Sequence, residues 1–309
     1  TSKNYYISKA VSRLWTLLFG KILKNQFYKF SDQTTYEVLR KLTTNERLIK
    51  VLTAQYGDYG LPPKRSSFAM HASVVRHYFD GGSFPVGGSS QIVKTIDPIV
   101  TKAGGTILVS ADVENVIIEN NTAVGVQMTD GSQFHAKNIV SNAGIMTTYN
   151  KLIPQKTIEK YHFKKQLQKV KRSVSHASLY IGLDGSPAEL GIPKCNYWVY
   201  PETGDHDSCV ENYLEDLSRP FPLVYLSFPS AKDPDWSNRY PGKSTIDVIT
   251  LIPYETFEAW KDTPWKKRGA DYETKKEEIA QRLLKEVYKQ LPQVEGKINT
   301  KNSTISISF

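Results

Sequence analysis

A strand-like end leads into a helix through two adjacent glycines in the segment Phe84-Pro85-Val86-Gly87-Gly88-Ser89-Ser90-Gln91. Glycine lets a backbone come close to a ligand, and the start of a helix offers free N–H groups to an electron-rich partner. Gly87 and Gly88 are therefore candidate ligand-binding positions. A tight turn that binds nothing explains the same residues, so both interpretations stay open.

The chain changes character on both sides of this turn. Three helices are predicted before it, at residues 9–30, 34–54 and 66–79. A further helix is predicted from Ser89 or Ser90 to about Ala103, where two glycines end it. Strand-like runs follow at residues 107–109, 113, 116–118, 124–128 and 139–140, with a hairpin turn at 129–131.

The second half is richer in strands. Aromatic and β-branched runs at 178–181, 197–200, 224–228 and 246–249 predict a mostly antiparallel sheet. An amphipathic helix is predicted over about 273–290, and a last strand over 302–309. The chain is thus predicted to be a mixed α/β protein.

The composition is that of a globular protein, with 39% hydrophobic and 23% charged residues in a chain of 309. This balance excludes a disordered chain, a collagen-like repeat and a coiled-coil rod. No run approaches the roughly 18 to 20 uncharged apolar residues that a membrane-spanning helix needs.

The net charge of +9 is concentrated in two blocks. Residues 1–50 and residues 151–172 each carry a net charge of +7, and the rest of the chain is acidic. Such blocks suit an anionic partner, such as phosphate, lipid headgroups or a cofactor pyrophosphate. A solvated basic surface with no partner explains them as well. Nucleic-acid binding would rest on the overall charge alone, and we do not predict it.

Common catalytic motifs are missing from the sequence. Neither glycine-rich segment near residue 85 completes Gly-x-Ser-x-Gly, and the six histidines show no zinc spacing. The sequence also lacks a Walker A loop and a Gly-x-Gly-x-x-Gly fingerprint. We predict no metal site, and no side chain is an obvious catalytic acid or base.

Residues 9–30 predict a basic amphipathic helix. Val11, Leu14, Trp15, Leu18 and Ile22 recur at helical spacing, with lysines beside the stripe. A helix of this kind can lie in a membrane interface. Packing in the protein core is an equally good interpretation of the pattern.

Several segments together resemble the FAD-dependent phytoene desaturase and amine oxidase-like superfamily, and within it the retinol saturase branch. They run in the family's order along nearly the whole chain: Gly57 to Pro63, Phe84 to Ser90, Ile139 to Gly144, Phe228 to Pro234, Arg239 to Thr245, Lys267 to Glu273 and Leu291 to Lys297. The resemblance implies part of a glutathione-reductase-like FAD domain and an antiparallel-sheet substrate domain with helices. Residues 1–79 would be a helical, membrane-facing part of the substrate domain, 80–150 the middle of the FAD domain, and 151–309 the rest of the substrate domain.

The resemblance also places the flavin residues. Val113 would face the adenine of FAD through its backbone, although it could be a plain core valine. Gly87 and Gly88 would open the helix beside the cofactor, and Asn142, Ala143 and Gly144 would end a strand that leads back to it. Gln91 would point into the substrate cavity, although a solvent-facing glutamine is as good an interpretation. The dinucleotide fingerprint and the last flavin segment would lie outside this chain, which resembles an internal fragment.

The implied activity is that of an FAD-dependent oxidoreductase, with NAD or NADP as a possible electron source. It would saturate, or alternatively desaturate or isomerise, a conjugated double bond of a retinoid or carotenoid-like lipid. The partners would be a lipophilic polyene and a membrane surface. The protein would be peripheral to the endoplasmic reticulum in a eukaryote, and otherwise to the cytoplasmic side of a membrane. A fragment that only binds lipid or membrane stays the alternative.

Overall fold

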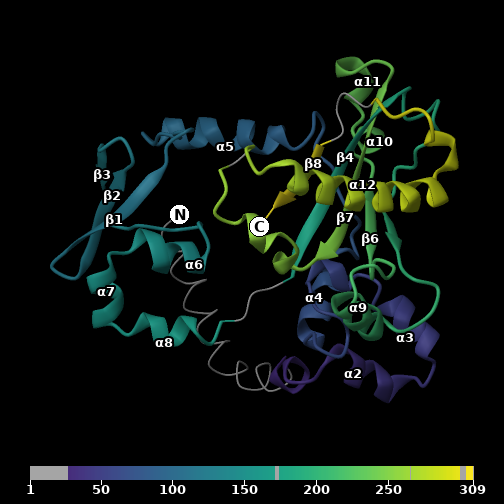
Figure 1. Cartoon of the computed structure of the whole chain (residues 1–309), viewed down its shortest axis with the longest axis horizontal. Helices are drawn as coiled ribbons and strands as arrows, with labels where there is room; N and C mark the ends of the chain where they lie inside the picture. Colours follow the sequence, from purple (N-terminus) through teal and green to yellow (C-terminus); the bar gives the residue numbers. More distant parts are fainter. Residues whose placement is uncertain (1–26, 171–173, 265, 300–303, 309) are drawn as a thin grey trace, which may run out of the picture. The chain divides into compact units, whose positions relative to one another are not determined.

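The computed structural model describes residues 27–170, 174–264, 266–299 and 304–308. The chain forms two compact units, residues 1–91 with 174–309, and residues 92–173. Figure 1 shows the helices and strands of both units. The predicted division by role, at 1–79, 80–150 and 151–309, stays a prediction.

A five-stranded antiparallel sheet forms the centre of the first unit, in the order β5-β6-β7-β4-β8. Its strands are β4 (Ser175–Asp184), β5 (Tyr197–Val199), β6 (Val224–Ser227), β7 (Lys243–Ile252) and β8 (Thr304–Ser308). All four predicted strands of the second half are present, as is the strand at the end of the chain. The predicted mixed fold with an antiparallel sheet is confirmed.

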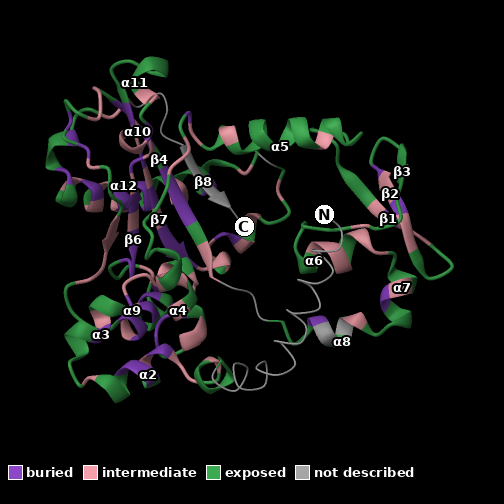
Figure 2. Cartoon of the chain, turned by 180° about the vertical axis from the view of Figure 1, so that it is seen from behind, coloured by how far each residue is buried: buried purple, intermediate pink, exposed green. Residues whose placement is uncertain are grey.

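One face of this sheet is covered by the helix α12 (Ala270–Gln290) (Figure 1). Side chains alternate between the faces of a strand, so Leu179 and Ile181 of β4 share a face with their partners Val248 and Ile246 of β7. These residues pack with Leu283 of α12, which is fully buried. Figure 2 shows the buried residues gathered in this layer. Burial of a side chain such as Leu283 stabilises the fold by about 1.5–3 kcal/mol.

Two short helices occupy the stretch where one helix was predicted over 34–54. These are α2 (Thr35–Leu42) and α3 (Glu46–Leu52). The single-helix prediction is wrong because Thr43 is extended and Asn45 caps a new helix through the N–H of Leu48. Thr34 caps α2 and forms a capping box with Glu37.

The remaining elements of the first unit are short, and residues 9–26 of the predicted first helix lie outside the described residues. Residues 27–31 are helical. The others are η1 (Tyr56–Asp58), α4 (Phe68–His77), α9 (His206–Glu215), α10 (Pro229–Lys232), α11 (Trp236–Arg239), η3 (Tyr254–Trp260) and η4 (Pro292–Val294).

The second unit contains a small antiparallel sheet of β1 (Val113–Glu119), β2 (Thr122–Met128) and β3 (Gln133–His135). Asn120 and Asn121 both have positive φ, as the two-residue turn between β1 and β2 requires. The helix α5 (Ser90–Lys102) runs into this unit, and its predicted bounds are confirmed. The helical elements after the sheet are α6 (Ile145–Thr147), η2 (Thr148–Leu152), α7 (Gln155–Lys160) and α8 (Phe163–Leu167).

Two predicted strands are absent from the described part of this unit. Residues 107–109 and 139–140 have no regular structure, and Val109 and Val140 are 84% and 92% exposed. A strand needs a neighbour for its backbone N–H and C=O groups. Neither run pairs with one among the described residues, so their β-branched composition does not make them strands.

Candidate functional site

The sheet face opposite α12 carries a different set of side chains. Tyr180 of β4 pairs with Asp247 of β7, and Ser178 pairs with Ile249, in positions that alternate with the core residues. Tyr180 is 43% exposed, whereas Leu179 beside it is 1% exposed. This face therefore combines aromatic, apolar and carboxylate groups, and helix α12 does not cover it.

A groove of about 660 Å³ lies on this face. Its floor includes Tyr180, Ser227 and Asp247 from three adjacent strands. The glycine turn before α5 forms one side, and the short helix α11 forms another through Trp236. The full lining is Phe84, Gly87, Gly88, Ser89, Ser90, Tyr180, Ile181, Gly182, Ser227, Pro229, Asp233, Trp236, Arg239, Tyr240, Thr245 and Asp247.

A second hollow of about 380 Å³ continues along the same face. Ser178 and Ile249 line it, and each lies two residues from a lining residue of the groove on its own strand. Because side chains two residues apart share a face, the two hollows lie next to each other along the strands. Trp198 and Tyr225 add aromatic surface to the second hollow. Together they make an extended surface on which aromatic and aliphatic side chains are mixed with polar ones, among them Asp58, His176 and Asp247.

The glycine turn is held in place by Asp233. The N–H of Gly87 donates to Oδ1 of Asp233 at 3.0 Å, and the N–H of Asp235 donates to the same atom at 3.0 Å. Arg239 forms an ion pair with the other oxygen of Asp233, whose side chain is 1% exposed. Burial opposes ionisation of Asp233, but these hydrogen bonds and Arg239 bring the pKa of this carboxyl below its usual value.

Sequence reasoning did not assign this role to Asp233. The segments around Asp233 and Arg239 carried the family resemblance, but 146 residues separate Asp233 from Gly87. The sequence did offer one indication of a role for Asp233 and Arg239: both lie in segments that mark the family.

Asp247 is the carboxylate on the groove floor. Burial raises the pKa of this side chain, and the charge of Lys232 partly offsets that effect. Lys232 is itself half-buried, and burial lowers the pKa of its ammonium group. Its Nζ donates to Ser227 Oγ at 2.8 Å and to Asn196 Oδ1 at 2.7 Å.

The predicted site residues fall in both units. Gly87 and Gly88 line the groove. The side chain of Gln91 packs against Gly87, and Gln91 is not one of the described residues that line the groove. Val113 begins β1 in the second unit. Residues 142–144 are exposed there, just before α6. The cofactor contacts assigned to all these residues stay predictions.

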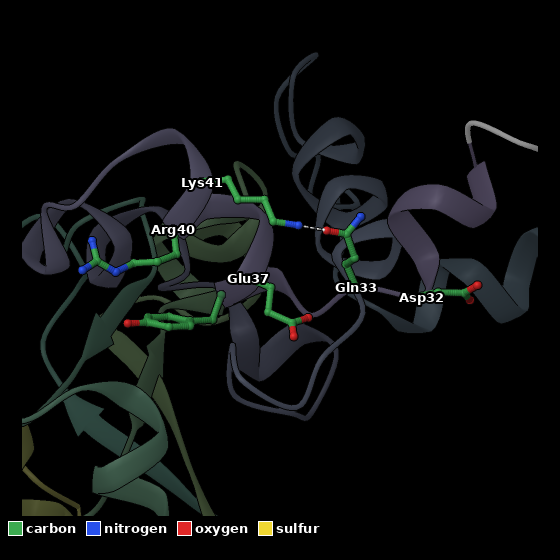
Figure 3. A pocket seen from close by; sticks show the side chains of 6 residues that line it. Asp32, Gln33, Glu37, Arg40 and Lys41 are labelled. Atoms are coloured by element: carbon green, nitrogen blue, oxygen red, sulfur yellow. Dashed lines mark hydrogen bonds between the residues drawn. The ribbon is translucent and has the colours of Figure 1, made fainter.

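Another hollow, at the surface of α2, has a different chemistry (Figure 3). Lys41 donates a hydrogen bond to Gln33, and Glu37 accepts one from the N–H of Thr34 at 2.7 Å. Its polar groups thus bind one another, and the hollow offers little apolar surface. The described residues contain no helix that is long and apolar enough to cross a membrane.

The chain as a whole matches a known family. The model of the flavin containing amine oxidoreductase family matches residues 29–306. The chain therefore belongs to this family of flavoproteins, as its sequence segments predicted.

Its similarity to individual proteins is more specific. The chain is 37% identical to the all-trans-retinol 13,14-reductase of Homo sapiens over 282 residues, which are 89% of this chain and 46% of that protein. It is 36% identical to the protein of the same name in Danio rerio over 280 residues, 88% of this chain and 46% of that protein. The prolycopene isomerase of Arabidopsis thaliana is 29% identical over 267 residues, 85% of this chain and 41% of that protein. The chain thus spans about half the length of these curated relatives, which support the resemblance to the retinol saturase branch.

Solved structures share the fold. An oxidoreductase from Methanosarcina mazei superimposes with a TM-score of 0.57 at 17% identity, over 96% of this chain and 60% of that one. A protein from Pyrococcus furiosus gives a TM-score of 0.54 at 16% identity, over 92% of this chain and 61% of that one.

Each unit by itself has one feature with the chemistry that a flavin nucleotide needs. The backbone at Gly88 is open, because the nearest atom to the position of an added Cβ is Arg239 Nη2 at 3.9 Å. A flat ring can approach such a backbone closely. Val113 lies on β1, an edge strand whose outer N–H and C=O groups point away from β2. These outer groups are suited to the edge of a base.

Proposed function

We propose that the chain forms part of an FAD-dependent oxidoreductase that acts on a conjugated double bond of a retinoid or carotenoid-like lipid. The observation that carries this proposal is the extended aromatic and apolar sheet face beside the glycine turn. The retinol reductase and prolycopene isomerase relatives support a polyene as the substrate class.

FAD, when bound, supplies hydride transfer to or from the substrate. This chain's contribution is to bind and orient the polyene and to exclude water from it. Gly87 and Gly88 keep the turn beside the groove thin, and Asp233 holds that turn in position. Trp198, Tyr225 and Ile249 offer apolar contact to a long hydrocarbon.

The test of the reaction uses the full-length flavoenzyme without oxygen. The flavin is reduced, an all-trans retinoid or a carotenoid is added, and two signals are followed: flavin reoxidation and loss of the conjugated absorbance of the polyene. We expect both to change together. Reoxidation without any change in a panel of retinoids and carotenoids would reject the polyene substrate.

The cofactor assignment has its own test. Val113 is proposed to contact the adenine of FAD through its backbone, so Val113→Ile should keep the bound flavin. Val113→Asp would bring a charge beside the base and should lower the flavin content, because an unpaired charge is costly to bury. NAD or NADP is proposed as the electron source, and steady-state turnover with each nucleotide identifies it.

A lipid-binding protein without catalysis is the second candidate function. A Danio rerio relative named inactive all-trans-retinol 13,14-reductase is 33% identical over 278 residues. That identity is close to the identities with the reductases. Polyene binding without loss of its conjugated absorbance, in the experiment above, would favour this function.

Association with a membrane surface is proposed for residues 9–30. Residues 27–30 are the part of this segment that the structure describes, and they are helical. Phe27 and Tyr28 are 56% and 54% exposed there, which supports the proposal. A polyene is nearly insoluble in water, so a position at a membrane would give access to the substrate. In a eukaryote we propose the endoplasmic reticulum, and otherwise the cytoplasmic side of a membrane.

A further inference from the structure

Asp247 occupies a distinctive place on the groove floor. It lies on β7 with Tyr180 opposite on β4 and Ser227 opposite on β6. The carboxylate is half-buried, and it lines the groove beside these two residues. A ligand in the groove therefore lies against this carboxylate.

The carboxylate of Asp247 has no hydrogen-bond or ion-pair partner among the residues that the structure describes. Asp233, in contrast, accepts two backbone N–H groups and pairs with Arg239. A carboxylate that faces an open groove is hydrated by solvent. An apolar ligand that displaces this water must provide a donor of its own, because a buried acceptor without a partner costs free energy.

Lys232 is close enough to influence Asp247, but its ammonium group is already engaged. It donates to Ser227 and Asn196, and it lies 5.4 Å from the ring centroid of Phe84. Asp247 is therefore the acceptor on the groove floor that lacks a protein donor among the described residues, and the hydroxyls of Tyr180 and Ser227 lie on the same floor. A hydroxyl group matches that acceptor, whereas a carboxylate is repelled by it.

We propose that Asp247 accepts a hydrogen bond from the hydroxyl end group of the substrate and thereby selects polyene alcohols over polyene carboxylates. The hydrocarbon part would then extend over Tyr225 and Ile249 into the second hollow. This inference rests on the proposed function, because it names the residue that recognises one end of a polyene.

The test measures binding to this 309-residue chain through quenching of its tryptophan fluorescence. Trp236 and Trp198 line the two hollows, so a ligand there changes the signal. The probes are all-trans-retinol, its methyl ether, which lacks the donor, and all-trans-retinoate. We expect the chain to bind retinol about tenfold more tightly than either of the others, as one hydrogen bond to a charged acceptor predicts.

Two substitutions of Asp247 separate attraction from repulsion. Asp247→Ala should bind all three probes within about twofold of one another. Asp247→Asn keeps an acceptor and gains a donor, so it should retain the preference for retinol over the ether but accept retinoate. The matched control is Asp184→Asn, which removes a carboxylate of β4 that pairs with Lys243 and does not line the groove. It should leave all three affinities unchanged.

The binding results and the flavin experiment together distinguish a wrong role for Asp247 from a wrong substrate class. If Asp247→Ala keeps the tenfold preference for retinol, Asp247 is not the recognition group, while the polyene function stands. If the unaltered chain prefers retinoate, Lys232 governs the polar end and the inference is overturned. If the unaltered chain binds none of the three probes, the inference about Asp247 is overturned, and the polyene function is decided by the flavin experiment on the full-length enzyme.

Discussion

Gly87 donates its backbone N–H to Oδ1 of Asp233 across 3.0 Å, although 146 residues separate the two in the chain. Gly87 has a φ of +89°, and Asp233 is almost completely buried. The hydrogen bond joins the turn before α5 to the loop after α10. It therefore fixes one side of the groove relative to its floor.

Asp233→Ala should lower the free energy of unfolding by about 2–4 kcal/mol, because it leaves the buried N–H of Gly87 without an acceptor and Arg239 without its inner partner. Denaturant unfolding measures this loss. The control is Asp235→Ala, which removes the outer pair with Arg239 Nε at 3.2 Å and an exposed hydrogen bond from Asn238 Nδ2 at 3.1 Å. It should cost less than about 1 kcal/mol. Equal losses in the two variants would contradict the role of Asp233.

Gly88→Val in the full-length enzyme should abolish polyene turnover. The new side chain adds bulk to the groove lining. Valine at a φ of +83° also costs about 1–2 kcal/mol of backbone strain. Gly81→Val is the control, since Gly81 has a φ of +86°, open space around it and no place in the groove lining. We expect similar losses of stability but loss of turnover at Gly88 only. Turnover in both variants would show that the turn does not border the reacting substrate.

Asp247→Asn should make the protein more stable at neutral pH. Burial raises the pKa of Asp247 in the folded state, and the charge of Lys232 opposes this effect. Burial also raises the pKa of Tyr225 on the neighbouring strand, and the charge of Asp247 contributes to that rise. A raised carboxyl pKa contributes stability that is present below the unfolded value, near 4, and is lost as the pH rises through the folded value. The advantage of the Asn variant should therefore shrink as the pH falls towards 4. Thermal unfolding between pH 4 and 8 checks this sign, and a constant difference would contradict it.

The helix predicted over residues 9–30 should bring the chain to anionic liposomes, with Trp15 and Phe19 in the interface and Lys21 and Lys24 near the headgroups. Co-sedimentation measures this association. The double variants Trp15→Ser/Phe19→Ser and Lys21→Glu/Lys24→Glu should each sediment less. If both sediment as the unaltered chain does, the helix belongs to the protein core.

The local sequence pattern predicted helices and strands correctly where tertiary packing supports them. The helix α12 appears near its predicted bounds, and β4 and β7 contain their predicted runs but extend three residues further at each end. It failed at residues 107–109 and 139–140, where a β-branched run has no partner among the described residues. The break between α2 and α3 was also missed, because Asn45 competes for a helix start within an otherwise helical pattern.

The sequence by itself determined the family, the mixed fold and the glycine turn, since motif order and hydrophobic period are local properties of the chain. Only the tertiary structure decided the partners of that turn and of the groove. Gly87 meets Asp233, and Asp247 stays without a protein donor among the described residues, because strand pairing and loop packing bring together positions far apart in the chain. Hydrogen bonds depend on distances of about 3 Å, and no spacing in a sequence encodes such distances between remote segments.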